Sequence, residues 1–227
     1  MPDLSHIGHW VFDLDNTIYP AECNLFAQVD VRIGAYIADT LDLPRDEARR
    51  MQKGYFRRYG TTMKGLMQEN GIDPHHFLDY VHDIDYSPVP PSADLAAALD
   101  RLDGPKYIFT NGSVKHAEAV LDRLGVAAQF VDIFDIAAAG FDPKPLDPFY
   151  DLFLTRHGMD PKTAVLVEDI AINLKPAHER GMTTVHVRTE SEWAMNGHDA
   201  DYIHHATDDL LAFLQEVAGR IPVERRA

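Results

Sequence analysis

Short apolar segments rich in β-branched and aromatic residues recur along the chain and alternate with segments of helical pattern. The predicted strands are residues 10–14, 107–110, 130–137, 164–167 and 183–187. Strands that alternate with helices are typical of a parallel sheet covered by helices on both faces. The sequence therefore predicts an α/β fold built on a doubly wound parallel sheet.

Capping residues mark the ends of two of the predicted helices. Ser92 is a candidate N-cap, and Gly104 closes the helix that follows it. Asp147 and Pro148 fit the N-cap and first position of another helix, which Gly158 ends. Both helices lie between predicted strands, as a doubly wound sheet requires.

One long stretch interrupts this alternation, because residues 21–87 show helical patterns and no good strand. A first apolar stripe with a period near 3.6 consists of Leu25, Phe26, Val29, Ile33, Tyr36, Ile37 and Leu41. A second helix runs from Pro44 to about Gly60, and a third begins at Asp73. We predict a helical cap at residues 21–87, inserted into a core formed by residues 1–20 and 88–227. A single merged domain is the alternative.

Charge and composition exclude several classes of function. The 227 residues carry 21 Lys and Arg against 36 Asp and Glu, a formal charge of −15. Such a chain repels phosphate backbones and anionic lipid, so we expect no nucleic-acid polymer and no membrane as partner. One cysteine cannot form an internal disulfide, and neither a signal peptide nor a membrane span is evident. We expect a cytoplasmic monomer or homodimer.

Two acidic residues, Asp13 and Asp15, lie at the end of the first predicted strand. Side chains at i and i+2 of a strand project to the same side, so these carboxyl groups are expected to converge unless the chain turns between them. Like charges that close are costly without a cation or a shared proton. Ligands of open parallel sheets bind beyond this edge. The alternative is a turn cap at Asp15 and a solvated strand end at Asp13.

The second predicted strand runs into Thr110, Asn111 and Gly112, directly before a helix. The free N–H groups and positive dipole at a helix N-terminus suit a phosphate oxygen. Simple N-capping explains the same residues equally well.

Two more charged groups follow later in the chain. Glu168 and Asp169 form a second acidic pair at the end of another predicted strand, and Lys144 stands between Pro143 and Pro145. The flanking prolines restrict the backbone, so this lysine is expected to have a fixed direction. A lone loop lysine is otherwise a solvated charge.

Taken together, these segments resemble the haloacid dehalogenase (HAD) superfamily of phosphotransferases. The four motifs, in the expected order, are Asp13-Leu14-Asp15-Asn16-Thr17, Thr110-Asn111-Gly112, Lys144-Pro145, and Glu168-Asp169 followed by Asn173. The resemblance implies a Rossmann-like core, and the insert lies where the first subfamily carries its helical cap. The fourth motif reads Glu-Asp where many relatives have Asp-Asp.

A closer similarity is to the pyrimidine 5′-nucleotidase branch. It is carried by residues 14–20 (Leu-Asp-Asn-Thr-Ile-Tyr-Pro), 59–62 (Tyr-Gly-Thr-Thr), 81–85 (Val-His-Asp-Ile-Asp) and 110–113 (Thr-Asn-Gly-Ser). This similarity implies a nucleoside 5′-monophosphate as substrate.

The resemblance implies a mechanism with two aspartates and a metal ion. Asp13 would attack phosphorus and form an aspartyl-phosphate, being ionised at neutral pH with an ordinary aspartate pKa. Asp15 would hold a proton for the leaving oxygen, which the negative charge around it favours, and would later take one from water. Mg²⁺ would be bound by carboxylate oxygens of Asp13 and Asp169 and by the backbone carbonyl of Asp15.

The remaining motif residues would support this chemistry. The resemblance places Glu168 near the metal, acting through water, and assigns Asn173 to the support of the metal loop. Thr110, with Asn111 and Gly112, would bind phosphate oxygens, and Lys144 would neutralise developing charge.

Substrate selection is expected from the cap. Tyr59, Thr61 and Thr62 lie at a glycine-containing break between cap helices, where side chains can point toward the core, and Phe56 or Tyr59 could stack on a base. Ordinary cap packing is the alternative for each of them. Three further residues, His82, Asp83 and Asp85, line either the cleft or the hinge.

Two features are assigned no function. The adjacent pairs His75-His76 and His204-His205 lack the spacing of zinc ligands and are expected to be solvated. Residues 221–227 are expected to be a frayed terminus.

The sequence thus predicts a Mg²⁺-dependent hydrolase of small phosphorylated metabolites, first of all nucleoside 5′-monophosphates. Phosphoglycolate or a sugar phosphate is the alternative substrate. A haloacid dehalogenase would need neither Asp15 nor the Glu168-Asp169 pair. A binding protein with a silent site is the alternative from another class.

Overall fold

A six-stranded parallel sheet forms the centre of the molecule in the computed structural model, which describes residues 4–191 and 194–220. The strands are β1 (His9–Phe12), β2 (Lys106–Phe109), β3 (Asp132–Phe134), β4 (Ala164–Glu168), β5 (Thr183–Val187) and β6 (His205–Thr207). Their spatial order is β3-β2-β1-β4-β5-β6. Strands β2 and β3 are thus added on one side of β1, and strands β4 to β6 on the other side. This is the doubly wound α/β fold that the strand and helix pattern predicts.

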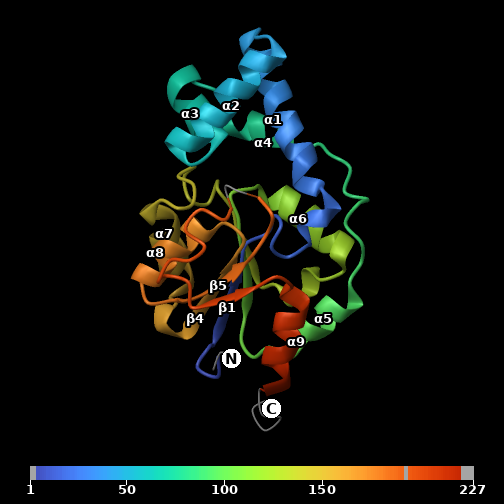
Figure 1. Cartoon of the computed structure of the whole chain (residues 1–227), viewed down its shortest axis with the longest axis vertical. Helices are drawn as coiled ribbons and strands as arrows, with labels where there is room; N and C mark the ends of the chain where they lie inside the picture. Colours follow the sequence, from blue (N-terminus) through green and yellow to red (C-terminus); the bar gives the residue numbers. More distant parts are fainter. Residues whose placement is uncertain (1–3, 192–193, 221–227) are drawn as a thin grey trace.

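Alternating side chains of the strands build two separate apolar layers. Trp10 and Phe12 face a layer that contains α5 (Ala93–Asp100), α6 (Val114–Leu124) and α9 (Leu210–Arg220). Val11 faces the other side, where α7 (Asp147–His157) and α8 (Ala171–Glu179) pack. Because successive residues of a strand point to opposite faces, buried strands are apolar on both. Figure 1 shows α7 and α8 on one side of the sheet and α5, α6 and α9 on the other.

The insert between β1 and β2 forms a group of helices beyond one edge of the sheet (Figure 1). These are α1 (Leu25–Leu41), α2 (Arg45–Tyr59), α3 (Thr62–Asn70) and α4 (Pro74–Val81). All of residues 21–87 are described, and no strand occurs among them. The predicted helical content is therefore confirmed, although α3 was not predicted. The division into core and cap at residues 20 and 87 stays a prediction.

Short 3₁₀ turns complete the connections, at η1 (Ala21–Cys23), η2 (Ala127–Gln129) and η3 (Pro161–Thr163). The predicted N-cap of α5 is confirmed, since the Ser92 hydroxyl accepts a hydrogen bond from the amide of Leu95. The predicted end at Gly104 is wrong, because α5 ends at Asp100 and Arg101 holds the C-cap position. For α7 the prediction is wrong by one residue, because Asp147 is the first helical residue and Leu146 holds the N-cap position.

Several predicted strand boundaries also change. β1 ends at Phe12, so Asp13 and Asp15 lie in the loop after the strand and not on it. The strand predicted at residues 130–137 is limited to Asp132–Phe134. β6 was missed because it is a three-residue edge strand that is only partly buried and has no apolar pattern.

Among residues 4–191 and 194–220, no helix is both long enough and apolar enough to cross a membrane. The predicted frayed terminus at residues 221–227 lies outside the described residues.

Candidate functional site

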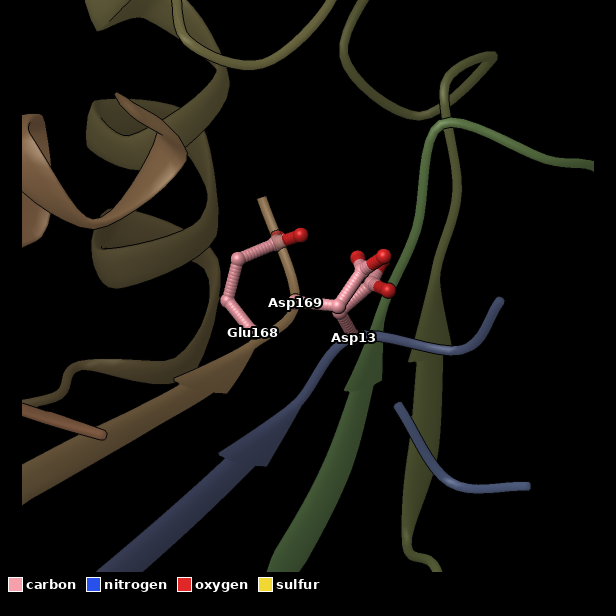
Figure 2. A group of neighbouring side chains, drawn as sticks. All are labelled: Asp13, Glu168 and Asp169. Atoms are coloured by element: carbon pink, nitrogen blue, oxygen red, sulfur yellow. The ribbon is translucent and has the colours of Figure 1, made fainter. Parts of the chain in front are cut away.

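Three buried carboxyl groups gather where β1 and β4 end. Asp13 follows β1, Glu168 is the last residue of β4, and Asp169 comes next. One carboxylate oxygen from each lies within 4.8 Å of the others. Figure 2 shows their side chains in the space beyond these two strands. The strands are neighbours, and the amide of Asp13 extends their pairing by donating to the carbonyl of Val167 at 2.9 Å. The sheet therefore places all three acids together, as predicted.

Lys144 forms ion pairs with two of these acids. Its ammonium nitrogen lies 2.6 Å from Asp13 Oδ1, 2.6 Å from Glu168 Oε2 and 2.9 Å from the carbonyl oxygen of Phe109. The side chain is 1% exposed, so it is not the solvated charge of the alternative interpretation. Burial lowers the pKa of Lys144, but the attraction of Asp13 and Glu168 outweighs it and raises the pKa. The residue is therefore an ammonium ion that donates a hydrogen bond with each of its three protons.

One ammonium group does not balance the acids around it. Burial and the charge of Glu168 raise the pKa of Asp13 to about 7, although Lys144 acts in the opposite direction. Burial, Glu168 and Asp13 raise the pKa of Asp169 well above its ordinary value. The expectation that Asp13 keeps an ordinary aspartate pKa is therefore wrong for the site without a cation.

The same group of oxygens fits a hard divalent cation. Its donors are carboxylate oxygens alone, which Mg²⁺ prefers, and the raised pKa values of Asp13 and Asp169 indicate a deficit of positive charge. Asp13, Glu168 and Asp169 are the residues that could bind such an ion.

Asp15 has hydrogen-bond partners outside this cluster. Its Oδ1 atom accepts hydrogen bonds from the Tyr19 hydroxyl at 2.6 Å and from His116 Nε2 at 2.9 Å. The predicted convergence with Asp13 required an unturned strand, but β1 ends at Phe12 and a turn begins at Asp15. The charge of Asp15 still raises the pKa of Asp13, so the two residues interact. Burial raises the pKa of Asp15, but His116 and Tyr19 lower it below its ordinary value. The expectation that neighbouring negative charge keeps Asp15 protonated is thus contradicted in this state. Its backbone carbonyl as a metal ligand stays a prediction.

Thr110, Asn111 and Gly112 follow β2 and lie next to Lys144. Thr110 Oγ1 accepts a hydrogen bond from the Gly112 amide at 2.9 Å. Asn111 Oδ1 accepts from the backbone amide of Lys144 at 2.9 Å, and Asn111 Nδ2 donates to the Lys144 carbonyl at 3.4 Å. The Asn111 side chain therefore positions the lysine, a role that the sequence did not indicate.

The N-terminus of α6 is largely satisfied by the protein itself. The Ser113 hydroxyl accepts from the amide of His116, and Asp135 accepts from the amide of Val114. The helix end is thus capped, as the alternative interpretation had it. Phosphate binding by Thr110, Asn111 and Gly112 stays a prediction.

The three predicted specificity residues of the cap all have partners within the cap. The Tyr59 hydroxyl donates to Glu69, and Thr61 Oγ1 accepts from the amide of Lys64 at 3.2 Å. Thr62 is buried and donates to the carbonyl of Gln52 at 3.0 Å. These contacts agree with ordinary cap packing, and contact with a substrate stays a prediction.

The inserted helices meet the rest of the chain beside Lys144. A Cβ atom at Gly60 would lie 3.6 Å from Pro143 Cγ and 3.7 Å from the carbonyl oxygen of Lys144. The ammonium of Lys64 in α3 lies 2.6 Å from Asp142 Oδ1. The break after α2 is therefore close to the site, as its glycine suggested.

Two histidines near the site were missed by the sequence analysis. His116 contacts Asp15, and His186 Nε2 lies 2.8 Å from the carbonyl oxygen of Asp169. A signal for His116 exists, because it shares one face of α6 with Val120 and Leu124, both of which face the sheet. A histidine on that buried face needs polar partners.

The adjacent histidine pairs behave largely as expected. His75, His76 and His204 are exposed and His205 is half-buried. Within the described part of the chain, the one group of residues able to bind a metal ion contains no histidine.

Comparison with known proteins gives one family and several similar chains. The family model described as "Hydrolase: haloacid dehalogenase-like hydrolase" matches residues 8–179. "Phosphate metabolism protein 8" of Saccharomyces cerevisiae is 27% identical over 193 residues, which are 75% of this chain and 58% of the yeast protein. The chain thus spans little more than half the length of that relative.

Two solved structures resemble the fold. A HAD phosphatase from Thermococcus onnurineus aligns with a TM-score of 0.61 and 19% identity, covering 96% of this chain and 100% of the other. The HAD-hydrolase YfnB from Bacillus subtilis, bound to magnesium, aligns with a TM-score of 0.59 and 16% identity, covering 93% and 98%. At these identities the likeness concerns the fold.

Proposed function

Because the chain belongs to the haloacid dehalogenase-like hydrolases, we propose that it is a Mg²⁺-dependent phosphomonoesterase that acts through an aspartyl-phosphate on Asp13. The observation that carries the proposal is the buried group of Asp13, Glu168 and Asp169 around Lys144. This arrangement suits an anionic nucleophile that must approach an anionic substrate.

The first step is phosphoryl transfer to the protein. A carboxylate oxygen of Asp13 forms a bond to phosphorus while the ester P–O bond breaks, and the leaving oxygen keeps the electron pair. That oxygen takes a proton from the carboxyl group of Asp15. Thr17 and Lys144 hold the two oxygens of Asp13 at 3.1 and 2.6 Å, so the nucleophile is fixed before the substrate arrives.

The second step releases phosphate. A water oxygen forms a bond to phosphorus as the bond to Asp13 breaks, and the carboxylate of Asp15 takes the water's proton. The lowered pKa of Asp15 in the free protein describes the carboxylate form that this step requires. The negative charge of a bound phosphate would raise that pKa and favour the protonated form needed in the first step.

Asp13, Glu168 and Asp169, with the backbone carbonyl of Asp15, would bind Mg²⁺. The ion would supply positive charge that offsets repulsion between the nucleophile and the phosphate. Lys144 supplies a second positive charge, and Asn111 keeps its backbone in place.

Nucleoside 5′-monophosphates are the substrates we propose, on the similarity of four segments to pyrimidine 5′-nucleotidases. The name of the yeast relative refers to phosphate metabolism, and one structural neighbour is described as a phosphatase. Phosphoglycolate and sugar phosphates are alternatives on the same machinery. Asp15 and the second acidic pair argue against a dehalogenase.

The test is hydrolysis of a panel of mononucleotides, phosphosugars and phosphoglycolate, each with and without Mg²⁺. We expect phosphate release only with Mg²⁺, and the largest kcat/KM for a pyrimidine 5′-mononucleotide. A larger kcat/KM for another phosphate would overturn the substrate and keep the reaction. No phosphate release from any ester with Mg²⁺ would overturn the reaction itself.

A further inference from the structure

A buried histidine joins the proposed acid–base residue to the segment that leads out of the cap. His116 in α6 is completely buried, and its Nε2 atom lies 2.9 Å from Asp15 Oδ1. The Tyr19 hydroxyl donates to the same oxygen at 2.6 Å. Oδ1 therefore has two donors, and Oδ2 is the oxygen left to exchange a proton with a substrate or water.

The other side of His116 is fixed by residues that follow α4. The Tyr86 hydroxyl lies 3.0 Å from His116 Nδ1 and 3.0 Å from the carbonyl oxygen of His82. The His82 ring stacks on His116 with centroids 4.2 Å apart and planes 10° apart, and His82 Nδ1 lies 3.0 Å from Ser113 Oγ. Burial and His116 lower the pKa of His82 to about 3, so this stacking brings no charge repulsion at neutral pH.

Packing alone does not explain a histidine at this position. A buried polar ring costs free energy unless its nitrogens are hydrogen-bonded, and leucine would fill an apolar helix face without that requirement. The loop after β2 also leaves room for the ring. A Cβ atom at Gly112 would lie 3.2 Å from His116 Cδ2, so only glycine fits beside it without displacement.

We infer that His116 is a positioning residue that fixes the rotation of the Asp15 carboxyl group, and that His82 and Tyr86 fix His116 from the segment following the cap. This inference rests on the proposed phosphomonoesterase activity. General acid–base catalysis needs the exchanging oxygen within hydrogen-bond reach of its partner, which a rotating carboxyl group satisfies only part of the time.

Two esters separate this role from a structural one. p-Nitrophenyl phosphate releases a stable anion that needs no proton, whereas uridine 5′-monophosphate releases a poorly stabilised alkoxide that does. Another alkyl phosphate replaces the nucleotide if the panel above favours it. In a two-step mechanism, kcat/KM reports phosphoryl transfer to the protein, and slower breakdown of the intermediate lowers kcat and KM together.

For His116→Leu we expect kcat/KM on the nucleotide to fall about 100-fold, the low end of what a general acid contributes. On p-nitrophenyl phosphate we expect kcat and KM to fall together, with kcat/KM changing less than about threefold. Tyr86→Phe removes only one hydroxyl. It should change the ratio of the kcat/KM values for the two esters in the same direction, by a smaller factor.

His116→Gln is the rescue variant, because its amide nitrogen can replace Nε2 and should restore about tenfold of the lost nucleotide activity. His157→Leu is the matched control. It removes a mostly buried ring that contacts Tyr107 and lies 3.4 Å from Asp132. It should leave the ratio of the kcat/KM values for the two esters unchanged.

Equal loss of kcat/KM on both esters in His116→Leu and Tyr86→Phe would overturn the inference and leave the proposed function standing. If His116→Leu does not fold, the ratio of the kcat/KM values of Tyr86→Phe for the two esters alone tests the inference. A wild-type protein that hydrolyses neither ester with Mg²⁺ would overturn the proposed function and this inference with it.

Discussion

Lys144 is the residue on which the charge balance of the site most depends. It is the ammonium that contacts both Asp13 and Glu168, each at 2.6 Å, and all three side chains are buried. Removing one partner of a buried ion pair leaves the other charge uncompensated, which costs about 3–5 kcal/mol. The lysine therefore stabilises the folded chain.

Lys144→Met should lower the free energy of unfolding by about 3–5 kcal/mol at pH 8 without metal. The loss should be smaller at pH 5, because Asp13, with a pKa of about 7, is then mostly protonated and needs less compensation. Urea denaturation at the two pH values measures the difference. Lys115→Met, at a lysine whose side chain is 83% exposed, is the control and should change stability by less than about 0.5 kcal/mol. An equal loss at both pH values would contradict this account of the charge.

At the scale of helices and strands, the packing of α2 on α3 shapes the cap. A Cβ atom at Gly65 would lie 2.5 Å from Tyr55 Cγ and 2.8 Å from Tyr59 Cδ2. The absence of a side chain at Gly65 therefore lets two tyrosines of α2 lie against α3.

Gly65→Ala should destabilise the protein by about 1–3 kcal/mol, because the added methyl group overpacks this contact. Gly54→Ala in α2 is the matched control, since nothing lies within 4 Å of a Cβ atom there. It should stabilise the helix by up to about 1 kcal/mol. Chemical denaturation of both variants tests the pair, and a Gly65→Ala protein as stable as wild type would show that the tyrosines move freely.

The sequence predicted which residues lie at the carboxyl ends of the strands, but it did not predict the directions of all their side chains. Asp13, Glu168 and Asp169 meet because parallel strands end at a common edge, which residue order alone indicates. The direction of Asp15 was not predictable in this way, because it depends on His116, 101 residues away in the chain. α3 was missed because its nine residues contain a glycine and few apolar side chains, and its packing against α2 stabilises it.

For the whole molecule, the decisive feature is an acidic chain of charge −15 that concentrates three carboxyl groups in its interior. The raised pKa of Asp13 favours the folded state at low pH, and this contribution is lost as the pH rises from about 4 to about 7. Without a cation, this group therefore makes the fold less stable at neutral pH than in mild acid.

Mg²⁺ should reverse this effect, and its stabilisation should depend on pH. Below pH 7 the ion must displace a proton from Asp13, so its apparent affinity should fall about tenfold per pH unit. Thermal unfolding should show a larger Mg²⁺-induced rise in Tm at pH 8 than at pH 5.5. Asp169→Asn should abolish most of the rise, and Na⁺ at matched ionic strength should produce none. An equal rise at both pH values would mean that Mg²⁺ binds elsewhere.

Covalent labelling of Asp13 is the most direct measurement of the central claim. Wild-type protein is mixed with Mg²⁺ and a ³²P-labelled pyrimidine 5′-mononucleotide, quenched in acid within one turnover and analysed by peptide mapping. We predict label on the peptide that contains Asp13, released by hydroxylamine as expected of an acyl phosphate, and no label on Asp13→Asn. Phosphate released in the same reaction with no label on the protein at any quench time would contradict the account.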